Sequence, residues 1–314
     1  MAVDALAGLL EGPRASGAFL LRITMNPPWS IRVQDESPLC LTAMVNGEGW
    51  VAYDDDTEPV RLGPGDVTIM RGTDPYLVAD DPAAEPQIVV YPGQRCVTRE
   101  GVDLRDEMSL GVRTWGNDLD GSMTMLLGVY EEVGAVGQRL LDALPRMLVV
   151  SDDSWDSTLV SVLGREITRE VPGQKVVLDR LLDLLLISVL RAWFDRPEAE
   201  APAWYRAHGD PVVGQALRLL HENPAYPWTV AGLATKIGLS RAALARSFTE
   251  LVGVPPMTYL TEWRLALAAD LLRGPDATLE AVSHQVGYSN GFALSTAFKR
   301  VRGMSPQDYR AAAT

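Results

Sequence analysis

The chain has 314 residues, of which 47% are hydrophobic, and a formal net charge of −13 at pH 7. A chain of this length is expected to form two domains, and its apolar content is sufficient for a core in each. The first residues lack a basic leader, and charged residues interrupt the most apolar stretch, 176–194. We therefore expect neither a secretory signal nor a membrane partner, and a cytoplasmic location.

Residues 1–132 contain short β-rich runs separated by glycine, proline and aspartate, a pattern typical of a β-sandwich or β-barrel. The runs are Phe19–Thr24, Leu39–Val45, Gly49–Tyr53, Asp66–Met70 and Gln87–Tyr91. The turn 62–66 (Leu-Gly-Pro-Gly-Asp) resembles the glycine-aspartate turn of cupin barrels, and residues 45–50 resemble the strand pair before it. The resemblance implies a cupin-like sensor domain over residues 1–132.

The histidine count bears on what such a barrel does. A metal-binding cupin needs two or three histidines and a carboxylate, but His208, His221 and His284 all lie outside the barrel region. We therefore expect no metal, no cofactor and no catalytic residue, and a barrel that binds a small effector without transforming it. The rival class is a metal-independent cupin enzyme with an appended helical domain.

Aromatic residues of the β-rich region are the candidates for an effector pocket, although each is also an ordinary core residue. They are Trp29, Trp50, Tyr53, Tyr76, Tyr91 and Trp115.

The two cysteines offer a competing sensor chemistry. Cys40 lies in a predicted strand, and Cys96 lies beside Arg95 and near Arg99, whose charges would lower its thiol pKa. A disulfide between Cys40 and Cys96 would be a simple oxidant switch. The alternative is that both are small buried hydrophobic residues.

Residues 133–195 are predicted to be a helical connector, with helices over 137–145, 157–170 and 173–194. The third helix is apolar around more than half of its circumference, so it must be buried on two sides, within its domain or against a second subunit. We expect a homodimer through residues 174–194. The proline-rich, charged run Arg196–Ala203 opens a linker that is predicted to span 196–210.

The region 211–314 contains the same pattern twice, at Thr229–Phe248 and Thr278–Phe298. Each copy has an amphipathic helix, a glycine turn, a serine N-cap candidate and a second helix, which predicts two helix-turn-helix motifs. The glycines, Gly238 and Gly287, stand where a sharp turn often requires positive φ. The N-cap candidates are Ser240 and Ser289.

A continuous helix is predicted over 256–272, between the two motifs. At 1.5 Å per residue it is about 25 Å long, and with its neighbours it would hold two recognition helices about 34 Å apart, one turn of DNA.

The charge distribution separates the C-terminal region from the rest of the chain. Residues 211–314 contain ten Lys/Arg and seven Asp/Glu, a net charge of +3, and the rest of the chain has a net charge of −16. A basic DNA reader joined to an acidic sensor fits this asymmetry. The balance of +3 is small, which favours a dimer as the DNA-binding form.

Residues 211–310 resemble the DNA-binding domain of the AraC/XylS family of bacterial transcription regulators, and the run Gly287–Arg310 resembles the family signature. The resemblance implies recognition helices over 240–251 and 289–301. Arg246 is the strongest candidate for a bidentate contact to guanine, whereas Thr296 stands where members often carry arginine, so the second motif should read bases less strongly. The full set of DNA-binding candidates is Arg241, Ala242, Ala245, Arg246, Asn290, Gly291, Phe292, Ser295, Thr296, Lys299 and Arg300.

Within this set, Phe292 has an alternative role as a core aromatic, and Lys299 and Arg300 are expected to contact phosphates rather than bases. The sequence thus predicts an α+β regulator: a cupin-like β-barrel, a helical dimerisation region and an all-α domain with two helix-turn-helix motifs. An effector, or oxidation of the cysteines, would reposition the DNA-binding domains. The expected partners are double-stranded DNA, RNA polymerase, a small effector and a second copy of the chain.

Overall fold

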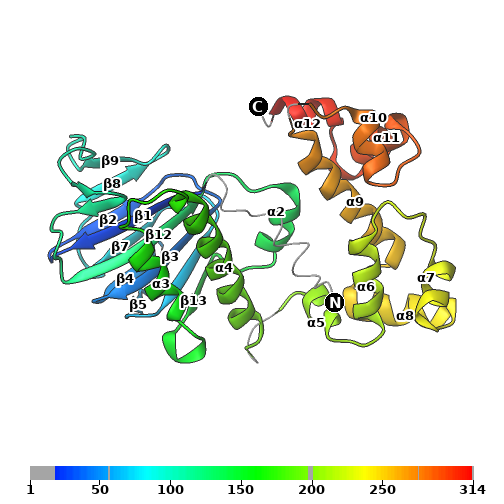
Figure 1. Cartoon of the computed structure of the whole chain (residues 1–314), viewed down its shortest axis with the longest axis horizontal. Helices are drawn as coiled ribbons and strands as arrows, with labels where there is room; N and C mark the ends of the chain where they lie inside the picture. Colours follow the sequence, from blue (N-terminus) through cyan, green and yellow to red (C-terminus); the bar gives the residue numbers. More distant parts are fainter. Residues whose placement is uncertain (1–17, 56, 197–200, 275, 313–314) are drawn as a thin grey trace. The chain divides into compact units, whose positions relative to one another are not determined.

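The computed structural model describes residues 18–55, 57–196, 201–274 and 276–312 (Figure 1). These residues form two compact units. The β unit comprises residues 18–133 and 144–196, and the helical unit comprises residues 134–143 and 201–312. The α+β class is therefore confirmed. None of the described helices combines the length and apolar character that a membrane span needs.

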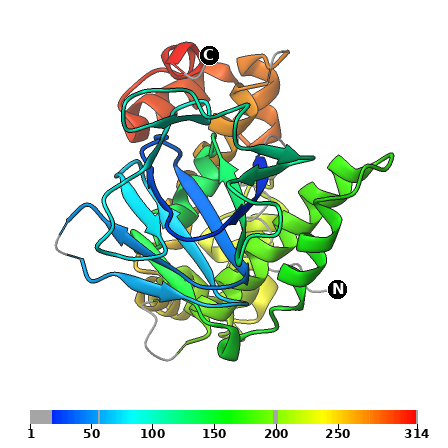
Figure 2. The same cartoon turned by 90° about the vertical axis from the view of Figure 1, so that its left-hand side faces the viewer.

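The β unit contains two sheets that face each other, seen from another side in Figure 2. The seven-stranded sheet has the order β10 (Ser109–Gly111), β11 (Thr114–Gly116), β1 (Phe19–Met25), β12 (Met123–Tyr130), β3 (Leu39–Asn46), β6 (Val67–Arg71), β13 (Met147–Val150). The six-stranded sheet has the order β5 (Val60–Leu62), β4 (Gly49–Tyr53), β7 (Tyr76–Ala79), β2 (Ser30–Val33), β8 (Ile88–Tyr91), β9 (Arg95–Thr98). All five predicted strands are confirmed.

The glycine-aspartate turn joins β5 to β6 as the sequence predicts. Gly65 has φ +87°, a conformation that favours glycine. One Asp66 carboxylate oxygen accepts a hydrogen bond from the Gly63 backbone N–H at 2.8 Å, and the other accepts one from the Asp152 N–H at 2.9 Å. The aspartate therefore closes its own turn and also ties down a distant loop.

Residues 144–195 extend the β unit rather than forming a separate helical region. Strand β13 pairs with β6 at the edge of the larger sheet, and helices α3 (Thr158–Glu166) and α4 (Gln174–Phe194) lie along the strands of that sheet (Figure 1). A Cβ atom at Gly128 of β12 would lie 2.8 Å from Leu182 Cδ1, so α4 packs directly against the sheet. The sequence predicted α4 almost to the residue, but within the predicted connector only residues 134–143 leave the β unit.

The helical unit is built around the long helix α9 (Pro256–Leu272), with one group of helices towards each end (Figure 1). The first group is α5 (Ala203–His208), α6 (Val213–Glu222), α7 (Val230–Ile237) and α8 (Arg241–Val252). The second is α10 (Leu279–Gln285), α11 (Gly291–Arg302) and α12 (Pro306–Ala312). Separate apolar clusters hold the groups together, one centred on Leu244 and Phe248 and the other on Leu294 and Phe298.

Two segments of the helical unit depart from the predicted boundaries. Helix α5 lies inside the predicted linker, and its Ala207 is buried in the first cluster; residues 197–200 of that linker lie outside the described part of the chain. Helix α2 (Ala135–Leu141) stands between β12 and β13 in the sequence, yet Ala135 and Val136 belong to the second cluster, with Trp263 and Leu265 of α9. The helical unit thus includes a segment that lies, in the sequence, between two strands of the β unit.

Candidate DNA interface and ligand cavity

Side-chain caps begin each helix of the two helix-turn-helix motifs. Ser240 Oγ accepts a hydrogen bond from the Ala243 N–H at 3.1 Å, as predicted. In the second motif, the cap is Asn290 Oδ1, which accepts from the Ala293 N–H at 2.9 Å. The predicted Ser289 cap is therefore wrong by one residue. Glu280 also holds the start of α11, because its carboxylate accepts a hydrogen bond from the Gly291 N–H at 2.8 Å.

The two turn glycines have the predicted backbone conformation but different surroundings. Gly238 has φ +78° and Gly287 has φ +86°. A Cβ atom at Gly238 would meet open space, whereas one at Gly287 would lie 2.7 Å from Ala225 Cα and 2.9 Å from Arg264 Nη2. The first turn thus needs glycine for its φ angle, and the second needs it also for close packing.

Helix α8 presents the predicted arginines outward. Arg241, Ala242 and Arg246 are exposed and Ala245 is half-buried, while Leu244 and Phe248 on the opposite face are fully buried. Among the described residues, no ion pair or hydrogen bond engages the guanidinium groups of Arg241 and Arg246. Both groups are therefore available to bases or phosphates.

Helix α11 presents a different surface. Phe292 is 84% exposed, so its alternative role as a core aromatic is wrong. The Thr296 hydroxyl donates a hydrogen bond to the Phe292 carbonyl at 3.0 Å, Ser295 is half-buried, and Lys299 and Arg300 are exposed.

Gly291 departs from its predicted role. It is buried against α10, where a Cβ atom would meet Glu280 Oε2 at 3.0 Å, so it does not face outward as predicted.

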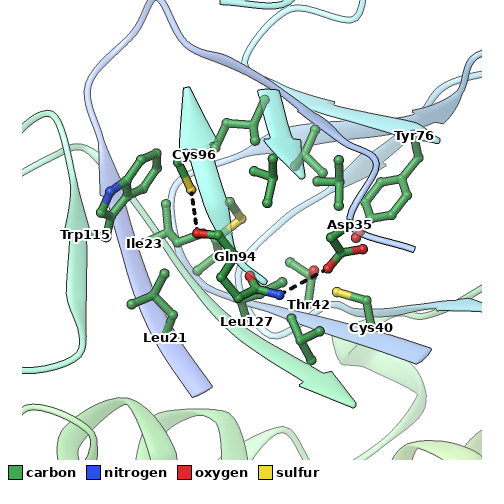
Figure 3. A pocket seen from close by; sticks show the side chains of 16 residues that line it. Leu21, Ile23, Asp35, Cys40, Thr42, Tyr76, Gln94, Cys96, Trp115 and Leu127 are labelled. Carbon is green, nitrogen blue, oxygen red and sulfur yellow. Dashed lines mark hydrogen bonds between the residues drawn. The ribbon is translucent and has the colours of Figure 1, made fainter. Parts of the chain in front are cut away.

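An apolar cavity of about 40 Å³ lies between the sheets of the β unit (Figure 3). Its walls come from alternate residues of facing strands, because side chains at i and i+2 share one face of a strand. The wall residues on strands include Leu21, Ile23, Ile31, Val33, Cys40, Thr42, Tyr76, Val78, Val90, Cys96, Trp115, Met125, Leu127 and Val129. Asp35 and Gln94 complete the lining from loops.

Of the six predicted pocket aromatics, Tyr76 and Trp115 line this cavity. Tyr53 packs edge-on against Tyr76, with ring centroids 6.5 Å apart, but its hydroxyl donates to the Arg146 carbonyl at 2.6 Å. Trp29 is fully buried in the core, Trp50 is half-buried and Tyr91 is exposed. Residue type alone points to the aromatic residues and gives no indication of the aliphatic wall. The i, i+2 alternation of Met125, Leu127 and Val129 was the signal that could have located it.

Both cysteines line the cavity and are free. Burial raises the pKa of the Cys40 thiol to about 12, with a further contribution from the charge of Asp35. Burial and the charge of Asp103 raise the pKa of Cys96 to about 11. The expected lowering by neighbouring arginines is therefore wrong.

Those two arginines are engaged elsewhere. The Arg95 guanidinium lies over the Tyr91 ring, and Arg99 pairs with Glu85 at 3.0 Å. In Figure 3, Cys40 and Cys96 lie on different sides of the cavity, with Gln94 between them.

The described residues contain no group of three or more histidine, cysteine, aspartate or glutamate side chains placed to hold a metal ion. His221 has a packing role: its ring stacks on Trp263, with centroids 4.4 Å apart, and its Nε2 forms a 2.8 Å hydrogen bond with the Tyr259 hydroxyl. Burial, with a smaller contribution from the charge of Arg139, lowers the pKa of His221 to about 3. His284 is exposed, with Nε2 3.3 Å from a Glu280 oxygen.

Comparison with known proteins agrees with both halves of this description. Residues 4–195 match the family described as Cupin, and residues 233–312 match the family described as Helix-turn-helix domain. The Cupin match continues through α3 and α4, as the β unit does.

Relatives that are named as transcription regulators are similar over most of the chain. An AraC-like transcription regulator of Streptomyces lividans is 33% identical over 287 residues, which is 90% of either chain. The regulator AlkR of Acinetobacter baylyi is 25% identical over 324 residues, covering 98% of this chain and 99% of that protein. The crystal structure of the AdpA DNA-binding domain in complex with target DNA is 31% identical, with a TM-score of 0.31, and covers 33% of this chain and 92% of that chain. The names of these relatives are consistent with a regulator that is not an enzyme.

Proposed function

Because the chain belongs to the AraC-like transcription regulators that join a Cupin domain to a helix-turn-helix domain, we propose that a small molecule in its β unit controls how its two motifs meet an operator. Binding of double-stranded DNA follows from the family. The proposal also covers four further points: the effector, how its signal is transmitted, which residues touch DNA, and the second copy of the chain. Since the operator lies on the chromosome, the cytoplasm is the expected place of action, and RNA polymerase the expected protein partner.

The DNA contact is proposed to be unequal between the motifs. The observation that carries this proposal is Arg246, which is exposed on a capped helix and has no partner among the described residues. Arg246 reads a guanine, with Arg241 beside it, while Ala242 and Ala245 leave room for thymine methyl groups. On α11, the exposed Phe292 supplies apolar contact, and Ser295 and Thr296 supply short-range polar contact. Asn290, Lys299 and Arg300 flank these residues and hold the helix at the backbone.

The chemistry of the cavity favours a small ligand over an oxidant as the signal that the protein senses. The thiolate is the reactive form of cysteine, and the raised pKa values of Cys40 and Cys96 keep both thiols protonated at neutral pH. An apolar cavity with a few polar groups is the usual form of a small-molecule site. Because both cysteines also line the cavity, the test is peroxide treatment of the wild-type protein, which should leave operator affinity unchanged. A response to peroxide that disappears when both cysteines are replaced by serine would favour oxidant sensing.

Helix α2 is proposed to carry the signal. Met125, Leu127 and Val129 of the cavity wall lie on β12, and α2 follows this strand at residue 135. Within the helical unit, the Asp270 carboxylate of α9 accepts hydrogen bonds from the Ala135 and Val136 N–H groups at the start of α2. A shift of β12 on ligand binding would therefore pull on a helix that is anchored to α9.

The homodimer is proposed to use the outer face of α4. One face of α4 is buried in the β unit through Leu178, Leu182 and Leu185. On the other face, Val177 is 45% and Leu184 46% exposed. An apolar stripe of this kind is suited to a second copy of the same helix.

The proposed function can be tested by selecting operators from random DNA with the full-length protein and then measuring affinity by fluorescence anisotropy. We expect a two-part sequence with its elements about 10 base pairs apart, because the two motifs lie along a single helix, α9. Affinity should fall steeply with salt for any DNA, but the preference for the selected sequence should persist. Equal affinity for selected and scrambled DNA at every salt concentration would contradict the proposal.

A further inference from the structure

The polar groups of the cavity gather at one end. Asp35, Thr42 and Tyr76 lie together there, while the remaining wall is largely aliphatic (Figure 3). Tyr76 is 5% exposed, and no nitrogen or oxygen atom of the described residues bonds its hydroxyl group; the neighbouring Cys40 thiol is only a weak hydrogen-bonding partner. A buried hydroxyl without a strong hydrogen-bond partner is energetically unfavourable. This group therefore points to a ligand that supplies the missing partner.

The Asp35 carboxylate sets the charge of this end. It accepts hydrogen bonds from the Ser37 hydroxyl at 2.8 Å and from the Gln94 side-chain amide at 3.3 Å. None of the described lysine and arginine residues lines this inner cavity. A ligand with its own carboxylate would thus meet an uncompensated negative charge in an apolar setting, which is strongly unfavourable.

Gln94 separates the cavity from a second pocket. That pocket has a volume of about 390 Å³, and Leu21, Gln94, Cys96 and Trp115 line both spaces, whereas Arg105 and Glu131 line the second pocket only. The inner cavity of about 40 Å³ holds about one water molecule, so a larger ligand must displace part of this shared wall. Gln94 lies in a hairpin turn with φ +57°, next to the edge strand β9, and a single long hydrogen bond joins its amide to Asp35.

From these observations we propose that the cavity binds a small, mostly hydrocarbon molecule with one hydroxyl group, an apolar alcohol or phenol. The ligand oxygen accepts a hydrogen bond from Tyr76, and its hydroxyl hydrogen is donated to Asp35 in place of the Gln94 amide. Displacement of Gln94 joins the inner cavity to the second pocket, which receives the rest of the molecule. The proposal deepens the sensing role above and rests on it, but ligand binding itself can be measured without DNA.

Four molecules with one carbon skeleton test this specificity by calorimetry on the full-length protein: 2-phenylethanol, ethylbenzene, 2-phenylethylamine and phenylacetate. We expect 2-phenylethanol to bind about tenfold more tightly than ethylbenzene and phenylacetate not to bind. Tyr76→Phe should reduce the difference in affinity between the alcohol and the hydrocarbon, and the hydrogen bond to Asp35 should preserve the rest of it. Asp35→Asn should let phenylacetate bind.

Tyr130→Phe is the matched control, because the Tyr130 hydroxyl is also buried without a described partner but does not line the cavity. It should leave the alcohol-to-hydrocarbon ratio unchanged. Tightest binding of the amine or of phenylacetate, an unchanged ratio in Tyr76→Phe, or no binding of any of the four would overturn the proposal. None of these outcomes would affect selective operator binding, so the proposed function would still stand. If the protein bound the alcohol but had no operator preference, only the proposed function would be contradicted.

Discussion

At the scale of single residues, Arg246 and Thr296 occupy matching positions in the two motifs but have different reach. The Arg246 guanidinium is exposed and unpaired among the described residues, whereas the Thr296 hydroxyl donates to its own helix backbone. Arg246→Ala should therefore weaken binding to the selected operator by about 1–3 kcal/mol, as expected for loss of a bidentate base contact. Thr296→Ala should cost less. Equal losses in an anisotropy titration would contradict the asymmetry between the motifs.

His221 gives the helical unit a predictable response to acid. Its pKa is about 3 in the folded protein, below its ordinary value of 6.5, so the unfolded chain binds more protons between these values. The stability that comes from the neutral ring is fully present above pH 6.5 and is lost as the pH falls towards 3. The free energy of unfolding should fall by up to about 1.4 kcal/mol per pH unit below 6.5.

The measurement is urea unfolding between pH 7.5 and 5. His221→Gln should flatten the pH dependence, and His284→Gln, at an exposed position, should not. An unchanged slope in His221→Gln would show that another group is responsible.

At the scale of elements, the anchoring of α2 to α9 is the contact that sequence periodicity could not indicate. Asp270 caps α2, and Arg139 of α2 lies 3.6 Å from Glu262 and over the Tyr259 ring. Asp270→Ala removes a cap that is worth about 1 kcal/mol. The variant should bind the effector and the operator as the wild type does, but the effector should change operator affinity by a smaller factor than in the wild type.

Asp308→Ala is the matched control, since Asp308 bonds Ser305 at the start of α12, away from α2. Coupling is obtained from operator affinity measured with and without saturating ligand. Full coupling in Asp270→Ala would exclude α2 as the route.

At the scale of the whole molecule, the outer face of α4 decides whether the chain acts alone. Leu184→Glu places a charge on the proposed dimer face at a position that is already 46% exposed, so folding should survive. Sedimentation should show a shift from dimer to monomer, and operator affinity should fall because two linked reading units gain from their effective concentration. Val102→Glu, at a 57% exposed site of the same β unit, should leave both unchanged. A wild-type monomer would exclude this interface.

Residue order alone predicted the duplicated motif, five strands of the β unit and the long helices α4 and α9, because each depends on local features: a period of 2 or 3.6, a cap or a glycine turn. The absence of histidine from the barrel region needed only the residue order. The tertiary structure decided which residues line the cavity, why Cys96 is protonated, why Phe292 is exposed and to which unit α2 belongs. These depend on burial and on contacts between residues far apart in the chain, such as Asp270 with Ala135, which local patterns do not encode.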